Sequence, residues 1–142
     1  MLYHFRIYKE KTGYWAECIE LEGCHTRADT PDELMENMRE ALNLYLDEPS
    51  KSNIVHPLPG DTRPEKNIAA IPVDPRTAFA VLLRHYRKKH NISQAGMAEK
   101  LNMKNVYSYQ RLEKRTDPKL STITKIKEVF PDFPVESLFH TC

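Results

Sequence analysis

Alternating polar and hydrophobic positions at the start of the chain predict β-strands. The apolar members of this alternation are Tyr3, Phe5 and Ile7. They are expected to line one buried face of a strand, which ends in a turn over residues 10–13 where Gly13 can adopt a positive φ. Aromatic and apolar residues predict a second strand over residues 14–19 and a short third strand over residues 24–28, so an antiparallel meander is expected.

A helix is predicted next from its start signal. Thr30 can cap the free N–H groups, Pro31 fits the first helical position, and Glu33 completes a reciprocal capping box. Apolar residues then repeat at helical spacing, at Leu34, Met38, Ala41, Leu42 and Tyr45. The helix is therefore expected to cover one face of the sheet and to end at Pro49.

Proline dominates the middle of the chain. Six of the ten prolines lie within residues 47–75, which predicts a stiffened loop or linker, with segment 47–66 as its Pro-rich part. Within this region, residues 67–73 are expected to form a fourth strand that returns to the sheet. Pro72 favours an edge strand or a strand end, because proline cannot donate a ladder hydrogen bond.

The second half of the chain has the periodicity of helices. The first helix has an apolar stripe at Phe79, Leu82, Leu83 and Tyr86, and its other faces carry Arg84, Arg87, Lys88 and Lys89. Asn91 breaks this helix, and Ser93 caps a second helix that ends at Leu101. The residues expected to be buried in the second helix are Ala95, Ala98 and Leu101.

Three more helices are expected after a tight turn at residues 102–103. One opens at Lys104 or Asn105 and continues through Lys114. Its inner positions are Val106, Tyr109 and Leu112. A fourth helix is marked by Leu120, Ile123, Ile126 and Phe130, and a short fifth helix by Val135, Leu138 and Phe139.

Charge separates the two halves of the chain. Residues 1–73 carry 8 basic and 13 acidic residues, a net charge of −5, whereas residues 74–142 carry 13 basic and 7 acidic residues, a net charge of +6. The asymmetry indicates two modules with different partners. The acidic half is expected to attract a basic protein, and the basic half to attract nucleic acid.

Composition narrows the class of protein further. Hydrophobic residues make up 40% of the 142 residues and charged residues 29%, as in soluble globular proteins. No apolar run has the length of a membrane span, and the N-terminal residues lack the pattern of a signal peptide. The odd number of cysteines, at Cys18, Cys24 and Cys142, favours a cytoplasmic protein with reduced thiols.

The stretch SQAGMAEKLNMKNVYSYQRLEK, residues 93–114, joins two short helical patterns through a tight turn. Residues 93–101 resemble the start of the helix-turn-helix in Xre/Cro-type repressor domains, and residues 111–114 with 117–120 resemble the end of the recognition helix and the start of the next helix. Met97 replaces the usual leucine, and the turn with its second helix is one residue longer than the commonest pattern.

This resemblance implies that a set of polar residues binds DNA. The alternative is that the same residues form only a solvated helix face. The set comprises Ser93, Gln94, Lys104, Asn105, Tyr107, Ser108, Gln110 and Arg111. Arginine and glutamine can read base edges, whereas lysine, tyrosine and serine can hold phosphates.

The first half resembles HicB, the antitoxin of HicA–HicB toxin–antitoxin modules, over residues 1–50. The matching segments are 13–16, 21–26, 29–34 and 39–42. The resemblance implies a partial RNase H-like domain that is not a nuclease and that blocks the active site of HicA, a small basic ribonuclease. It also implies a C-terminal domain that binds the operator of its own operon.

Other interpretations of the same residues remain open at this stage. A metal-binding carboxylate cluster could be formed by Asp29, Asp32, Glu33 and Glu36. Helix capping and a solvated helix face are the favoured interpretation, because acidic residues stabilise helix N-termini. A zinc site could be suggested by Cys18, Cys24 and His25, but a structural zinc site needs four ligands in paired spacings. A core or half-buried role for the cysteines is therefore favoured. For Trp15 a core role is favoured, and a position at an interface is the alternative.

The sequence thus predicts an α+β protein with a HicB-like toxin-binding domain at 1–73 and an all-α helix-turn-helix domain at 74–142. The expected function is that of a cytoplasmic antitoxin and repressor without enzymatic activity, metal or cofactor. Its expected partners are a HicA-type toxin, operator DNA and at least a second copy of the chain. Expected toxin contacts are Tyr14, Trp15, Glu17, Glu20 and Glu22. The alternative is a stand-alone regulator whose N-terminal domain senses a ligand or another protein.

Overall fold

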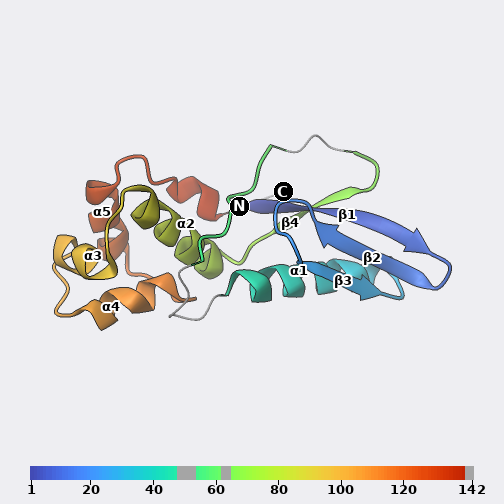
Figure 1. Cartoon of the computed structure of the whole chain (residues 1–142), viewed down its shortest axis with the longest axis horizontal. Coiled ribbons are helices and arrows are strands. Elements are labelled where there is room, and N and C mark those ends of the chain that lie inside the picture. Colours follow the sequence, from blue (N-terminus) through green and yellow to red (C-terminus); the bar gives the residue numbers. More distant parts are fainter. Residues whose placement is uncertain (48–53, 62–64, 140–142) are drawn as a thin grey trace.

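A four-stranded antiparallel sheet forms one end of the molecule in the computed structural model, which describes residues 1–47, 54–61 and 65–139 (Figure 1). The strands are β1 (Leu2–Glu10), β2 (Gly13–Cys18), β3 (His25–Ala28) and β4 (Ile68–Pro72). Their order is β3-β2-β1-β4, so the first three strands form the predicted meander. The fourth strand lies at the edge beside β1 and ends at Pro72, as predicted.

Helices form the other end of the molecule, while α1 lies along the sheet (Figure 1). The α-helices are α1 (Pro31–Leu46), α2 (Pro75–Lys89), α3 (Gln94–Lys100), α4 (Val106–Gln110) and α5 (Leu120–Val129). Two short 3-10 helices are η1 (Arg111–Glu113) and η2 (Val135–Leu138). The chain is therefore of mixed α and β structure, consistent with the α+β class. Among the described residues no helix combines the length and the apolar character of a membrane span.

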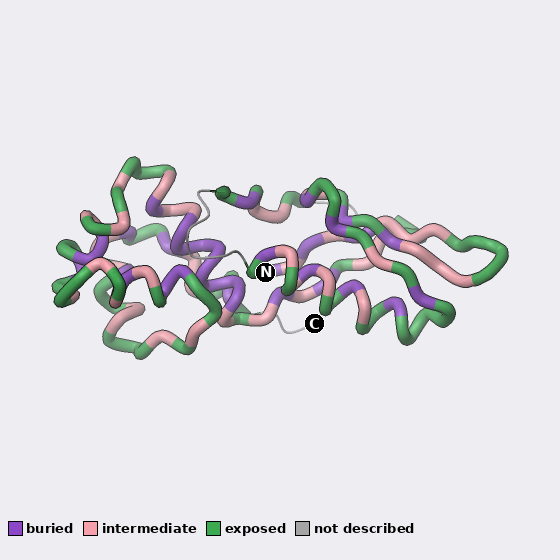
Figure 2. The backbone as a smooth tube through the Cα atoms, turned by 60° about the horizontal axis from the view of Figure 1, so that its bottom comes forward, coloured by how far each residue is buried: buried purple, intermediate pink, exposed green. Residues whose placement is uncertain are grey.

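The β1–β2 hairpin turns where the sequence predicts. Glu10 pairs with Gly13, and Gly13 has a φ of +108°. A Cβ atom at this position would lie 2.8 Å from the carbonyl oxygen of Ala28, so glycine is required by backbone conformation and by space. The hairpin tip points away from the helices and is exposed (Figure 2).

Helix α1 begins at the predicted cap, although only the Thr30 half of the predicted reciprocal capping box is formed. The backbone N–H of Glu33 donates to the Thr30 hydroxyl at 3.2 Å, and Pro31 is the first helical residue. Its buried residues are Leu34, Met38, Leu42 and Leu46. These residues repeat every four positions and pack on the sheet face that carries Tyr3 and Phe5, both fully buried. The prediction that Pro49 ends this helix falls outside the described residues, as do Pro64 and Cys142.

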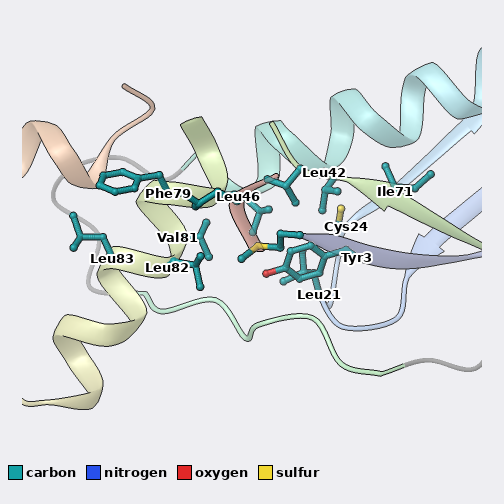
Figure 3. Close-up of a cluster of buried hydrophobic side chains, with 14 of the residues drawn as sticks. Tyr3, Leu21, Cys24, Leu42, Leu46, Ile71, Phe79, Val81, Leu82 and Leu83 are labelled. Carbon is teal, nitrogen blue, oxygen red and sulfur yellow. The ribbon is translucent and has the colours of Figure 1, made fainter. Parts of the chain in front are cut away.

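One hydrophobic cluster runs from the sheet into the helices. Figure 3 shows Tyr3, Leu42 and Ile71 in the same cluster as Phe79 and other α2 side chains. The N-terminal amino group donates to the carbonyl oxygen of Ser137 at 2.5 Å, which ties the start of β1 to η2. The two halves that the sequence separates by charge therefore share packing at their junction.

The burial of two arginines of α2 contradicts the sequence prediction. Arg84 and Arg87 are only 4% and 5% exposed, although the periodicity placed them on polar faces. Both face Glu113 of η1, which is 3% exposed. Periodicity assigns charged residues to solvent, but a charged side chain can be buried when a partner of opposite charge is buried with it.

Two further predictions in the helical half need correction. Ala95 is exposed, because the buried stripe of α3 contains Met97 and Ala98, and Ala95 lies about 200° around the helix from Met97. The third helix ends as an α-helix at Gln110 and continues as η1 only to Glu113. The predicted fourth and fifth helices correspond to α5 and η2, where Leu120 and the adjacent Phe139 are 82% and 61% exposed.

Replacing Gly13 with alanine is expected to lower the free energy of unfolding by about 1–3 kcal/mol, because the positive φ and the contact with Ala28 both oppose a Cβ atom. Urea denaturation measures this change. Gly60→Ala is the matched control, since a Cβ atom at Gly60 meets nothing within 4 Å. Equal stability of the two variants would contradict the role assigned to Gly13.

Replacing Glu113 with alanine is expected to cost about 3–5 kcal/mol of unfolding free energy, because it leaves buried guanidinium groups without their carboxylate. The control is Glu10→Ala, which breaks the exposed pair with Arg27 and is expected to change stability little. Similar denaturation midpoints for both variants would show that the buried pair does not hold the helical half together.

Candidate functional site

Helices α3 and α4 carry the polar set predicted to bind DNA, and a buried ion pair beneath them fixes their positions. Arg87 of α2 donates from Nε to Glu113 Oε2 at 2.5 Å and from Nη2 to Oε1 at 3.1 Å. Arg84 donates from Nη2 to the carbonyl oxygen of Glu113 at 2.7 Å. Helix α2 thereby holds η1, the direct continuation of α4, through three hydrogen bonds to one residue.

The same carboxylate also reaches α3. Gln94 donates from Nε2 to Glu113 Oε1 at 3.2 Å, and its own Oε1 accepts from Gln110 Nε2 at 2.9 Å. Burial acts to raise the pKa of Glu113, but the hydrogen bonds and charge of Arg87 and the hydrogen bond from Gln94 outweigh it and hold this pKa below its ordinary value. The carboxylate is therefore ionised and accepts hydrogen bonds from α2 and α3 together.

Capping explains the positions of three members of the predicted DNA-binding set. The Ser93 hydroxyl accepts from the N–H of Gly96 at 2.9 Å and caps α3. Asn105 Oδ1 accepts from the N–H of Ser108 at 2.9 Å and from its hydroxyl at 3.2 Å, which caps α4. These side chains define where the two helices begin, so they have a structural role whether or not they also contact a ligand.

Three of the remaining members are exposed. Lys104 and Arg111 are exposed at opposite ends of α4, and Tyr107 between them is 69% exposed. The pair Gln94 and Gln110 is half-buried behind them. The surface around α4 therefore presents two cations, a phenol hydroxyl and an amide pair, groups that can hold phosphates and read base edges.

The residues predicted to bind a toxin do not share one surface. Tyr14 lies on the inner face of the sheet with Ala16, whereas Trp15 and Glu17 lie on the opposite face, because successive residues of a strand alternate. Trp15 is half-buried and stacks on Tyr8, with ring centroids 4.4 Å apart and an interplanar angle of 15°. The Tyr8 hydroxyl donates to Glu17 at 3.0 Å. Trp15 is thus a surface residue of the sheet and not a core residue.

Glu20 has a structural role that the sequence did not indicate. Its carboxylate accepts from the backbone N–H of His4 at 2.9 Å, lies 2.6 Å from His4 Nδ1, and accepts from the N–H of Gly60 at 3.3 Å. It thus connects β1 to the loop that contains Gly60. Glu22 is exposed in the turn, where its carbonyl oxygen accepts from the Tyr45 hydroxyl at 2.6 Å.

The cysteines and acidic residues form no metal site in the described part of the chain. No three His, Cys, Asp or Glu side chains there lie close enough together to hold an ion. Cys18 and Cys24 are buried, as expected for core residues, and His25 is exposed. The neighbouring Cys24 thiol, together with burial, raises the pKa of the Cys18 thiol, which keeps it protonated.

Sequence reasoning missed the anchoring residues Arg84, Arg87 and Glu113. Two arginines spaced three residues apart within an apolar helical run were an available signal, because that spacing places both on one side of a helix. The position of Glu113 inside the motif RLEK was visible. Its burial depends on how η1 packs against α2, which periodicity does not show.

Comparison with known proteins places the chain in a family. No family model matches it. It is 48% identical over 42 residues to a UPF0150 protein of Archaeoglobus fulgidus, covering 29% of this chain and 61% of that protein. It is 35% identical over 68 residues to a UPF0150 protein of Synechocystis sp., covering 40% of this chain and 86% of that protein. Because it spans most of the Synechocystis relative at this identity, the chain belongs to the UPF0150 family.

Proposed function

We propose that the chain is a HicB-type antitoxin that neutralises a small basic ribonuclease and represses its own operon. The observation that carries the proposal is the order of the folded units. The HicB-like segments lie on β2, on the β2–β3 connection and on α1, and the Xre/Cro-like segments lie on α3, on η1 and at the start of α5. Membership in the UPF0150 family, which is HicB-like, supports the first half of this assignment.

In this proposal the sheet with α1 is a partial RNase H-like domain that supplies the toxin-binding surface. Its net charge of −5 over residues 1–73 suits a basic partner. Of the predicted contacts, Trp15, Glu17 and Glu22 are available at the surface, whereas the carboxylate of Glu20 serves the fold. The domain inhibits by covering the toxin and has no catalytic activity of its own.

The second half of the proposal assigns α3 and α4 to a helix-turn-helix. A turn over residues 101–105 separates the two helices, and Asn102 within it has a positive φ of 54°. Helix α4 is the recognition helix, and the Arg87–Glu113 pair holds it against α2. Such domains commonly bind as dimers, with one recognition helix in each half-site, so the active form is at least a dimer located with the DNA in the cytoplasm.

The proposal predicts that a small basic ribonuclease is encoded beside this gene. The full-length chain is expected to inhibit RNA cleavage by that protein when the two are equimolar, because occlusion requires only binding. RNA cleavage assays with the two purified proteins measure this. The chain alone, with Mg²⁺ or Mn²⁺, is expected to cleave neither RNA nor DNA. Undiminished cleavage by the neighbour, or cleavage by the chain itself that is lost with Asp29→Ala or Glu33→Ala, would contradict the proposal.

Arg111→Ala is expected to weaken operator binding by about 1–3 kcal/mol if its guanidinium reads a base, with relaxed preference at one base pair. Lys104→Ala is expected to weaken binding to all sequences alike and to flatten the salt dependence, because a phosphate contact releases counterions. Operator affinity at two salt concentrations measures both effects. The control is Lys9→Ala, an exposed lysine at the hairpin tip.

Gln110→Ala belongs to the same series, but this variant loses the hydrogen bond to Gln94 as well as the expected contact with DNA. Circular dichroism must therefore show that this variant folds before its affinity is interpreted. If folded alanine variants of Lys104, Tyr107, Gln110 and Arg111 all bind the operator as tightly as the parent does, α4 is not the element that reads the DNA. Toxin binding is expected to stay unchanged throughout the series.

A further inference from the structure

A groove runs between α1 and the start of α2. It has a volume of about 830 Å³, and its walls include the exposed side of α1, the β4–α2 connection and Arg115. The groove thus lies at the junction of the acidic sheet half and the basic helical half, where Asn43 of α1 accepts a hydrogen bond at Oδ1 from the N–H of Asp74 at 2.9 Å. Neither the DNA-binding set nor the toxin-binding set includes any of its residues.

The α1 wall of the groove is acidic. Glu36, Glu40 and Asp47 line it. Glu36 and Glu40 are four residues apart on one stripe of α1, and Asp47 follows the last residue of the helix as its C-cap. All three are exposed, and among the described residues none forms an ion pair. The only cation that α1 contributes to this wall is Arg39. Three carboxylates against one guanidinium leave a negative wall that suits a positively charged occupant.

The carboxylate on the opposite wall is already paired with two arginines. Asp74 accepts from Arg76 Nη2 at 3.2 Å and from Arg115 Nη2 at 3.1 Å, and the hydrogen bond from Arg76 is the main cause of its lowered pKa. The carboxylates available to a ligand are therefore those of α1. A solvated helix face would explain acidic residues there, but it would not explain why they border a concave surface.

Apolar and unpartnered polar groups complete the groove. Leu44 and Met35 are 73% and 44% exposed on the α1 side. Thr77 of α2 also lines the groove; it is 2% exposed, and its hydroxyl has no hydrogen-bond partner within the part of the chain that is described. A buried hydroxyl without a partner costs stability, and a ligand that supplied one would recover that cost.

We propose that this groove is where the basic toxin docks, by inserting a lysine- or arginine-bearing segment that pairs with Glu36, Glu40 and Asp47 and packs its aliphatic part on Leu44. The inference rests on the proposed function, because the occupant is the toxin of that proposal. It differs from the sequence prediction, which placed the contact at Tyr14, Trp15, Glu17, Glu20 and Glu22. The outer sheet face carries cations such as Arg6 and Arg27 beside its acidic residues, so it offers a basic partner less complementarity.

Three full-length charge-neutralised variants test the location. The groove variant carries Glu36→Gln, Glu40→Gln and Asp47→Asn. The sheet variant carries Glu17→Gln and Glu22→Gln. The matched control neutralises three exposed carboxylates of the helical half, with Glu99→Gln, Glu128→Gln and Asp132→Asn. Calorimetry at two salt concentrations measures the affinity of each for the small basic protein encoded beside the gene.

The groove variant is expected to lose about tenfold or more in affinity and to show a weaker salt dependence, while the other two variants match the parent. Affinity lost in the sheet variant but kept in the groove variant would overturn the inference and leave the proposed function standing. Equal affinity of all three variants and the parent would likewise overturn the inference and leave the proposed function standing. If the parent itself does not bind the neighbouring protein, the proposed function and this inference both fail.

A site-specific cross-link gives an independent measurement. Leu44→Cys and Leu120→Cys place thiols at two leucines that are 73% and 82% exposed, each combined with Cys142→Ser. After labelling with a benzophenone maleimide, only the Leu44 site is expected to cross-link to the neighbouring protein under ultraviolet light. Cross-linking from Leu120 and not from Leu44 would contradict docking in the groove.

Thr77→Val distinguishes a ligand contact from a merely structural role. Valine has a similar shape and removes the unpartnered hydroxyl, so the free chain is expected to be at least as stable as the parent in urea. Affinity for the neighbouring protein is nevertheless expected to fall severalfold, because the ligand loses its polar contact. Unchanged affinity would exclude Thr77 from the docking contact.

Discussion

The helical half of the molecule depends on one buried interaction, the ion pair between Arg87 and Glu113 with Arg84 beside it. Burying charges costs several kcal/mol for each ion, and only close geometry with added hydrogen bonds offsets that cost. Here the carboxylate receives bonds from Arg87 and Gln94, and the Glu113 carbonyl oxygen receives one from Arg84. Helices α3 and α4 are too short to hold their positions by periodic packing alone, so this cluster fixes their relative placement.

The polar chain that starts at Glu113 also reaches the candidate DNA surface. Gln94 donates to the carboxylate from one end of its amide and accepts from Gln110 at the other, so the buried charge orients side chains near the exposed face of α4. A surface supported in this way loses little side-chain freedom when it binds a ligand. The stability of the helical half and the geometry of its candidate site are therefore set by the same few residues.

The two halves are distinct in charge but continuous in packing. The hydrophobic cluster passes from Tyr3 and Leu42 to Phe79, and the N-terminal amino group bonds to Ser137 near the end of the described chain. The groove between α1 and α2 lies at this junction and is lined by residues of both halves. Under the proposed function, an occupant of the groove would contact the sheet half and the helical half together, which links the two activities through one surface.

The sequence by itself determined the local structure. Strand alternation, the Thr30 cap, Gly13 and the edge position of β4 all follow from short-range rules of backbone conformation, and they agree with the structure. Only the tertiary structure decided which charged residues are buried, because Arg84 and Glu113 are 29 residues apart and meet through packing. It also decided which face of the sheet is covered, so that Trp15 lies on the outer face, and it formed the groove. Periodicity describes one element at a time, whereas a site depends on how elements far apart in the sequence pack together.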